Sequence, residues 1–290
     1  MTQLSAPMRV RHIAECPEVS PPLCEELGDA VEEELPAHWH EQGIVWFRLE
    51  PTINAGLGKG WQAHVSVPVD LRDLSIEYTD VDGNPFDPPY GNIHHRNEVL
   101  AGLADGKMDI QRLTRSGSWT LGVSLGTSLP LGRIEEDPYA LAALGLEHQH
   151  FQLGNGTFVP RAGTLAIRDG APWGFLATAE GWWALYANSE GYTPSSGTLV
   201  AAGPTLDAGK NGQLMALGEV AYDAQDHWDG ELNPQSGRLA ARAGVGGLWP
   251  LGTGVVLQAQ VRTTVAQMDL AEAQFRQPLI ATVGLSWEPR

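Results

Sequence analysis

Three pairs of closely spaced histidines are the side chains in this sequence best suited to chemistry. Two pairs follow the pattern His-x-His and one is His-His. Imidazole nitrogens bind Cu(II), Zn(II) and Ni(II), and ligand softness places copper and zinc first. The pattern predicts a copper or zinc site and no other cofactor; the alternative is that these histidines are solvated or hydrogen-bonded to nearby backbone. The six residues are His38, His40, His94, His95, His148 and His150.

The two cysteines, Cys16 and Cys24, lie in an acidic segment that we predict to be a loop over residues 13–42. No lysine or arginine occurs between Arg11 and Arg48, so this segment would raise the local concentration of cations. In an exported protein an even number of closely spaced cysteines predicts a disulfide bond. The alternative is a pair of thiols that binds metal.

Charged side chains at the polar positions of strand-like segments form another candidate group. They could line a narrow polar pathway. They could equally form a salt-bridge network that fills and rigidifies the interior. The predicted interior residues are Arg48, Glu50, His64, Asp70, Arg72, Glu180, Glu219, Arg242 and Arg262.

Enzymatic chemistry has weak support. No GxSxG, HExxH or CxxC motif occurs, and His64 has no serine or aspartate partner at an informative spacing. No glycine-rich phosphate loop precedes a helix, and a formal charge of -17 argues against nucleic acid as a partner. We therefore predict a protein that is not an enzyme, and keep a membrane-embedded hydrolase as the alternative from another class.

The segment 44–71 decides which elements position these residues. Apolar side chains such as Val45, Phe47 and Leu49 alternate with polar ones such as Arg48, and the alternation resumes after a Gly58-Lys59-Gly60 turn. Period-two alternation predicts two strands, each with one apolar and one polar face. A strand of a dozen residues is roughly 40 Å long, and a tilt of about 45° leaves roughly 28 Å of height, which is close to the apolar band of an outer-membrane barrel.

The composition favours lipid on the apolar side. Only 18% of the 290 residues are charged, and only three are lysine, whereas strand surfaces that face water usually carry many lysines and glutamates. No run of about 18 apolar residues occurs, so a membrane-spanning helix is excluded. The alternative is a large soluble barrel with the apolar side chains in its core.

The same alternation recurs along the chain and predicts twelve strands. Five connections are short, beginning at Gly58, Arg115, Asp169, Asp207 and Pro250, and they alternate with long ones. This pattern predicts an all-β fold: a transmembrane antiparallel up-and-down β-barrel of about twelve strands, forming a single domain over residues 1–290, with long loops on one side and short turns on the other. The predicted strands are 5–12, 44–57, 61–78, 97–113, 119–129, 158–168, 173–186, 198–206, 213–222, 238–249, 255–266 and 279–287.

Five tryptophans share the phase of the apolar face and lie near the short turns or at the last strand's end. Such a ring is typical of a membrane interface. The alternative places all five in the core of a soluble barrel. They are Trp61, Trp119, Trp173, Trp249 and Trp287.

Several short motifs resemble a known family. Gly102-Leu103-Ala104-Asp105-Gly106, Ser128-Leu129-Pro130-Leu131-Gly132 and the segment 148–157, which begins His148-Gln149-His150, are similar to motifs of bacterial outer-membrane β-barrel transporters related to the phenol-degradation MetA-pathway proteins. The resemblance covers roughly residues 60–290 and implies barrel architecture more than a particular activity. One departure is that Glu288-Pro289-Arg290 follow Trp287, whereas such barrels often end on an aromatic residue.

Together these features predict a channel or transport component in the bacterial outer membrane. Its partners would be the lipid bilayer and a small solute, with copper or zinc bound at the long-loop end. The alternative is a non-conducting binding or scaffold protein whose loops recruit a periplasmic or extracellular protein. Residues 1–11 contain no apolar stretch typical of a signal peptide, so we expect the numbered chain to be the mature form.

Overall fold

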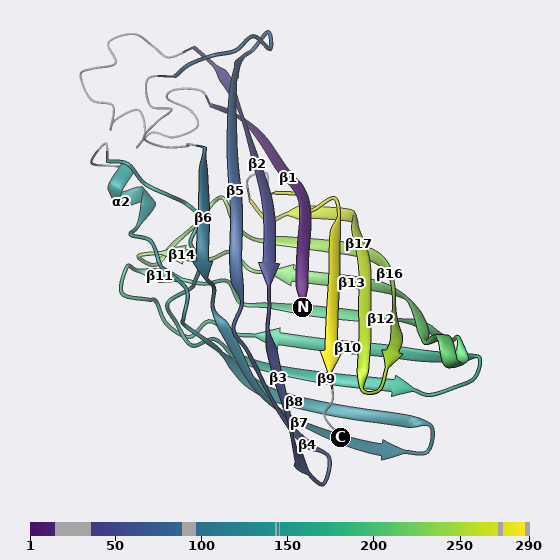
Figure 1. Ribbon diagram of the computed structural model, residues 1–290. Helices are drawn as coiled ribbons and strands as arrows, with labels where there is room; N and C mark the ends of the chain where they lie inside the picture. Colours follow the sequence, from purple (N-terminus) through teal and green to yellow (C-terminus); the bar gives the residue numbers. More distant parts are fainter. Residues whose placement is uncertain (15–35, 89–96, 143, 145, 272–274, 288–290) are drawn as a thin grey trace.

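The structure is a computed structural model that describes residues 1–14, 36–88, 97–142, 144, 146–271 and 275–287. It is an all-β antiparallel fold with one sheet of fifteen strands and a small sheet of three (Figure 1). Among the described residues no helix is long and apolar enough to cross a membrane. The large sheet contains β1 (Thr2–Ala14), β2 (His38–Leu49), β3 (Thr52–Gly58), β4 (Trp61–Ser66), β5 (Val69–Asp80), β6 (Glu98–Leu103), β7 (Gly106–Ser116), β8 (Trp119–Leu129), β9 (Pro160–Arg168), β10 (Trp173–Trp182), β12 (Gly197–Asp207), β13 (Gln213–Asp223), β16 (Arg238–Gly252), β17 (Val255–Asp269) and β18 (Ile280–Trp287).

The remaining elements lie in the long connections between these strands. The small sheet pairs β11 (Tyr192–Thr193) with β14 (His227–Trp228) and β14 with β15 (Glu231–Leu232). One short helix, α2 (Pro138–Ala142), and one 3₁₀ turn, η2 (Gly209–Asn211), complete the elements of the described chain. The small sheet therefore joins two loops that are far apart in sequence.

Apart from the pairs β2 and β3, β4 and β5, and β6 and β7, strands of the large sheet that follow one another in the chain are also neighbours in the sheet. The first strand also pairs with the last, since Thr2 of β1 lies opposite Val283 of β18. Three predicted strands are each divided by a break, into β2 and β3, β4 and β5, and β6 and β7. The sheet therefore has fifteen strands where twelve are predicted.

The three breaks lie beside one another and two contain proline. Pro51 separates β2 from β3, and Pro68 separates β4 from β5. Proline has no N–H for the ladder, which interrupts a strand at that residue. The carbonyl groups still find partners across the breaks: Val67 N–H donates to the Pro51 oxygen (3.2 Å) and Ala104 N–H to the Pro68 oxygen (2.9 Å). The chain can thus bend at this level without losing backbone hydrogen bonds.

The sheet carries its apolar side chains outward. Leu125 of β8 is 70% exposed and Val123 is 58% exposed, whereas Asp70 of β5 is 0% exposed. Water-soluble folds do the reverse, because apolar surface is driven out of water. The predicted orientation is confirmed, and the alternative of a soluble barrel with an apolar core is wrong.

The tryptophans of the predicted interfacial ring follow the same rule. Trp61, Trp119, Trp173 and Trp287 are exposed large side chains at strand ends. Trp249 is partly exposed and lies three residues before the end of β16. A core role for these five side chains is therefore wrong.

The predicted acidic loop 13–42 is too long at both ends. β1 extends to Ala14, and β2 begins at His38, where it pairs with β1 and β5. Consequently His38 and His40 are strand residues and not loop residues. The physical reason is ladder pairing: His40 lies opposite both His12 and Tyr78, so the backbone groups of all three strands are satisfied in the sheet.

Other predicted boundaries shift by a few residues, and the connection pattern is confirmed. The prediction 173–186 is too long, since β10 ends at Trp182, whereas β17 extends to Asp269. The short connections are 59–60, 117–118, 169–172, 208–212 and 253–254, and they alternate with long ones.

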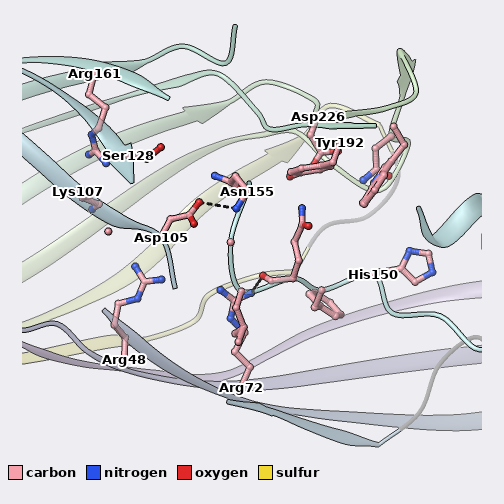
Figure 2. Close-up of a pocket in the computed structure, with 17 residues that line it drawn as sticks. Arg48, Arg72, Asp105, Lys107, Ser128, His150, Asn155, Arg161, Tyr192 and Asp226 are labelled. Atoms are coloured by element: carbon pink, nitrogen blue, oxygen red, sulfur yellow. Dashed lines mark hydrogen bonds between the residues drawn. The ribbon is translucent and has the colours of Figure 1, made fainter. Parts of the chain in front are cut away.

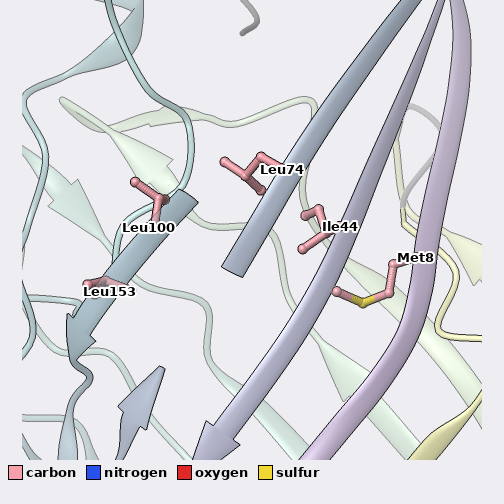
Figure 3. Close-up of a cluster of buried hydrophobic side chains, with 5 residues drawn as sticks. All are labelled: Met8, Ile44, Leu74, Leu100 and Leu153. Carbon is pink, nitrogen blue, oxygen red and sulfur yellow. The ribbon is translucent and has the colours of Figure 1, made fainter. Parts of the chain in front are cut away.

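The connection from β8 to β9, residues 130–159, folds back against the sheet, and we name it the β8–β9 loop. Its Leu153 is buried with Met8, Ile44, Leu74 and Leu100, which come from four strands (Figure 3). Those four residues lie on the face opposite the exposed apolar side chains. The interior face is therefore apolar here, beneath a loop that the sequence predicts to be external.

Replacing Leu125 by arginine tests the lipid-facing surface. We expect Leu125→Arg to lower the free energy of unfolding by about 2–4 kcal/mol in lipid vesicles, because it places a charge near the middle of a lipid-facing strand. Urea unfolding in vesicles measures this change. The matched control is Leu185→Arg, at a loop leucine of the same 70% exposure. Equal stabilities of the two variants would contradict a lipid-facing position for Leu125.

Candidate functional site: an interior polar chamber

A cavity of about 380 Å³ lies on the interior face, and we name it the polar chamber (Figure 2). Three parts of the chain enclose it: strands of the large sheet, the β8–β9 loop and the small sheet. Its size falls within the range of small-molecule sites. Its polar lining includes Arg48, Arg72, Lys107 and Arg161 from the strands, His150, Gln152 and Asn155 from the loop, and Tyr192, Asp226 and Asn233 from the region of the small sheet.

One wall of the polar chamber is a triad of two arginines and a buried aspartate. Arg48 Nε donates to Asp70 Oδ1 (2.7 Å), and its Nη2 donates to Oδ2 (2.9 Å). Arg72 Nη2 donates to the same Oδ2 (2.8 Å) and its Nη1 to the Gln152 carbonyl (2.9 Å). The bidentate pair fixes the guanidinium plane of Arg48, and two bonds to separate acceptors fix that of Arg72. Because Arg48 and Asp70 are direct cross-strand partners on β2 and β5, the sheet register itself builds this pair.

Trp46 supports the same two arginines from the side. The guanidinium carbons of Arg48 and Arg72 lie 4.8 and 4.7 Å from the centre of its ring. These distances are suitable for cation–π attraction, which is stronger where water is excluded. The triad is thereby held as a rigid cationic surface.

Arg161 and Lys107 also line the polar chamber. Arg161 donates through Nε (2.6 Å) and through Nη2 to Glu180 Oε1, from the neighbouring strand β10. Lys107 lies on β7 directly after a strand break. Among the residues that the structure describes, no carboxylate forms a salt bridge with Lys107.

Asp105 attaches the β8–β9 loop to the sheet. Its Oδ1 accepts the Gly132 N–H (3.1 Å) and its Oδ2 accepts the Asn155 N–H (2.7 Å; Figure 2). The two ends of the loop cross closely, because a Cβ on Gly132 would lie 2.6 Å from the Gly154 Cα. One carboxylate thus holds both ends of the segment that closes the polar chamber.

The region of the small sheet closes the polar chamber from another side. Tyr192 Oη donates to Asp226 Oδ2 (3.0 Å), and the Tyr192 and Trp228 rings lie 4.8 Å apart. Burial raises the pKa of Asp226 and raises the pKa of Tyr192 well above its ordinary value. Tyr139 of α2 donates to Asn233 Oδ1 (2.8 Å), which ties the β8–β9 loop to this region.

A second triad lies farther round the sheet and does not line the polar chamber. Glu219 of β13 accepts Arg242 Nη1 (2.5 Å) and Arg262 Nη1 (2.9 Å), and Arg242 Nη2 also donates to Gln277 Oε1 (3.3 Å). Glu219 and Arg242 are less than a tenth exposed. This cluster has the form of a salt-bridge network that rigidifies the interior.

The nine predicted interior residues do not form one group in the structure. Two triads use six of them, and Glu180 pairs with Arg161. His64 Nδ1 contacts Asn54 Oδ1 (2.5 Å) between β3 and β4, and Glu50 lies in the break between β2 and β3.

The sequence prediction missed Asp105, Lys107, Arg161, Tyr192 and Asp226. One signal was present: Lys107 alternates with the exposed Met108 and Ile110, which puts it in the polar phase. Tyr192 lies in the two-residue strand β11 and Asp226 lies in a loop, so no strand periodicity could have placed them on the polar chamber.

Four of the six predicted metal ligands fall within the described residues. His40 Nε2 and His38 Nε2 lie 3.2 Å apart, and both side chains are buried. The His148 and His150 ring centres are 5.2 Å apart. His94, His95, Cys16 and Cys24 lie outside the described residues, and the described part contains no cluster of three or more side chains suited to a metal ion.

Comparison of the sequence with protein-family models and with characterised proteins gives no match. Solved structures do match the fold. An outer membrane channel from Pseudomonas putida F1 superposes with a TM-score of 0.54 at 11% identity, over 98% of this chain and 94% of the other.

Two lower-scoring neighbours are the β domain of the Bordetella autotransporter BrkA (TM-score 0.38, 12% identity, 99% and 98% of the two chains) and outer membrane phospholipase A from Escherichia coli (TM-score 0.36, 12% identity, 99% and 89%). The chain has the fold of a bacterial outer-membrane β-barrel protein, as its sequence predicts. Membership of the MetA-pathway-like group stays a prediction.

Removing the shared carboxylate of the second triad tests its structural role. We expect Glu219→Ala to lower the free energy of unfolding by about 3–5 kcal/mol, because the buried Arg242 and the partly exposed Arg262 lose their shared counter-ion. Urea unfolding in detergent measures it. As a control, Asp169→Ala removes the exposed partner of Arg115 and is expected to cost about 0–1 kcal/mol. Equal costs would contradict a buried network.

Proposed function

We propose that this chain is an outer-membrane channel for a small polar solute, closed as a barrel of twelve spans. The pairing of β1 with β18 supports closure on one side. On the other side, the strand order ends at β3, which continues from β2, and at β6, which continues into β7. Both of these spans pair with the span made of β4 and β5. Counting each broken strand once reduces the fifteen strands to twelve, an even number as in bacterial barrels.

The observation that carries this proposal is the inverted distribution of side chains. Exposed apolar residues cover the outer face, and buried ion pairs with the polar chamber occupy the inner one. A polar interior within an apolar band suits passage of a hydrated solute and does not require a catalytic step. The structural neighbour from Pseudomonas putida F1 supports the architecture and leaves the solute open.

The β8–β9 loop favours a second candidate, a non-conducting outer-membrane binding or scaffold protein. The loop is anchored at Asp105, at Arg72 and in the apolar cluster around Leu153. In this place the loop occupies part of the interior. The two candidates are separated by whether releasing the loop opens a current.

Asp105→Ala tests the channel directly. We expect wild-type protein in planar bilayers to give small conductance steps, and Asp105→Ala to raise the step size several-fold, because both ends of the loop lose their shared acceptor. Asp169→Ala, which removes an exposed carboxylate from a short turn, is the control and keeps wild-type steps. Complete absence of current in the wild type and in Asp105→Ala would favour the scaffold function.

We also propose that His38 and His40 bind a copper or zinc ion. A tetrahedral ion with nitrogen ligands about 2.0–2.1 Å away places two such ligands about 3.3 Å apart, and the two Nε2 atoms are separated by 3.2 Å. His38 Nδ1 donates to the Pro36 carbonyl oxygen (2.8 Å), the kind of outer hydrogen bond that orients a histidine ligand. The His148 Nδ1 contact with the Leu146 oxygen (2.9 Å) repeats this arrangement in the other His-x-His pair.

Titration calorimetry of copper and zinc chloride into detergent-solubilised protein tests this site. We expect His38→Ala and His40→Ala each to weaken binding by at least about tenfold, equivalent to about 1.4 kcal/mol. His64→Ala changes a histidine that lies in neither pair and is the control. Unchanged affinity in the His38→Ala/His40→Ala double variant would contradict the site.

A further inference from the structure

Lys107 distinguishes itself from the other cations around the polar chamber. Figure 2 shows its side chain on the same wall as Arg161 and Arg48. Arg48 forms a salt bridge with Asp70, and Arg161 forms one with Glu180. Lys107 forms no salt bridge within the described part of the chain, although it is only partly exposed. It is therefore a cation that the enclosing side chains leave without a direct counter-ion.

The carboxylates that line the polar chamber are already engaged. Asp105 accepts the backbone N–H groups of Gly132 and Asn155, and Asp226 accepts the Tyr192 hydroxyl. Glu50 and Glu180 attract Lys107 through space, while Arg48 and Arg161 repel it. A charged group withdrawn from bulk water is costly without a partner. An anion in the cavity would supply that partner.

The remaining lining of the polar chamber determines what kind of anion fits. Phe151, Leu153 and Trp228 contribute apolar surface to the same cavity as Lys107. A bare inorganic ion would leave this surface unused. A ligand with an anionic end and a short apolar portion would pair with Lys107 and also contact the apolar lining. Small-molecule sites commonly combine an apolar lining with a few polar groups in this way.

We propose that the polar chamber binds a small organic carboxylate whose carboxylate group pairs with Lys107 and whose apolar portion contacts Phe151, Leu153 and Trp228. As a statement about the transported solute, this rests on the proposed channel function. As a statement about binding it does not, because a cavity can hold a ligand whether or not it conducts. Lys107 is then the residue that selects charge in the chamber.

Equilibrium binding tests the site without requiring transport. Butyrate is titrated into full-length protein in detergent, with butyramide as the uncharged ligand of matched shape. We expect butyrate to bind at least about tenfold more tightly than butyramide, since a charge-assisted hydrogen bond to Lys107 is available only to the carboxylate. Equal binding of the two ligands would overturn the proposal.

Charge variants place the effect on one residue. Lys107→Gln is expected to weaken butyrate binding by at least about tenfold, and Lys107→Arg to retain it, which separates loss of charge from loss of fold. Lys210→Gln is the matched control, because Lys210 is an exposed lysine in the short turn at η2. Butyrate binding that is the same in Lys107→Gln as in the wild type would also overturn the proposal.

Bilayer recordings in a potassium chloride gradient separate this inference from the channel proposal. We expect a reversal potential that indicates preference for chloride, and a shift toward potassium in Lys107→Gln. Butyrate binding that depends on Lys107 without any current would support the carboxylate site and overturn the channel. Current that is indifferent to Lys107, in a protein whose butyrate binding is also indifferent to it, would support the channel and overturn the carboxylate site.

Discussion

The constraint on which the structure depends is that one face of every long strand meets hydrocarbon. No water is available there, so each backbone N–H and C=O must be paired within the sheet. The antiparallel ladders meet this requirement, including the pairing of β1 with β18. Side chains such as Leu125 and Val123 can then face outward at no cost, and ion-paired carboxylates such as Asp70 and Glu219 are directed to the interior face. The hydrocarbon outside the sheet therefore explains why these ion pairs lie on its interior face.

Charges confined to an interior must find partners, and the structure contains two solutions. Asp70 and Glu219 each form salt bridges with two arginines through short, charge-assisted bonds. In both triads the acid and one arginine are direct cross-strand neighbours. The register that places leucines outside therefore also places these ion pairs inside. The same strand pairing thus orients the apolar face outward and makes the interior rigid.

The sequence could predict what local periodicity determines. Alternation identified strands such as 119–129, the turn at Gly58-Lys59-Gly60 and the polar phase of Arg48 and Asp70. It could not predict the apolar interior patch, because Ile44 and Leu74 are in the polar phase and become buried only through contact with Leu153 of a distant loop. Nor could it place His38 in a strand, since that pairing depends on β1 and β5.

The strand breaks explain why the polar chamber lies where it does. Pro51, Pro68 and the Ala104-Asp105 pair interrupt three adjacent spans at one level, and Arg48, Asp70 and Lys107 lie within three residues of these breaks. A regular ladder would hold Asp105 in a strand, whereas the break allows its carboxylate to accept N–H groups from the β8–β9 loop. The breaks thus interrupt the regular sheet and allow the β8–β9 loop to pack against its interior face. Because the ion-pair partners are fixed by the ladder on either side, Lys107 is left facing the cavity with its charge available to a ligand.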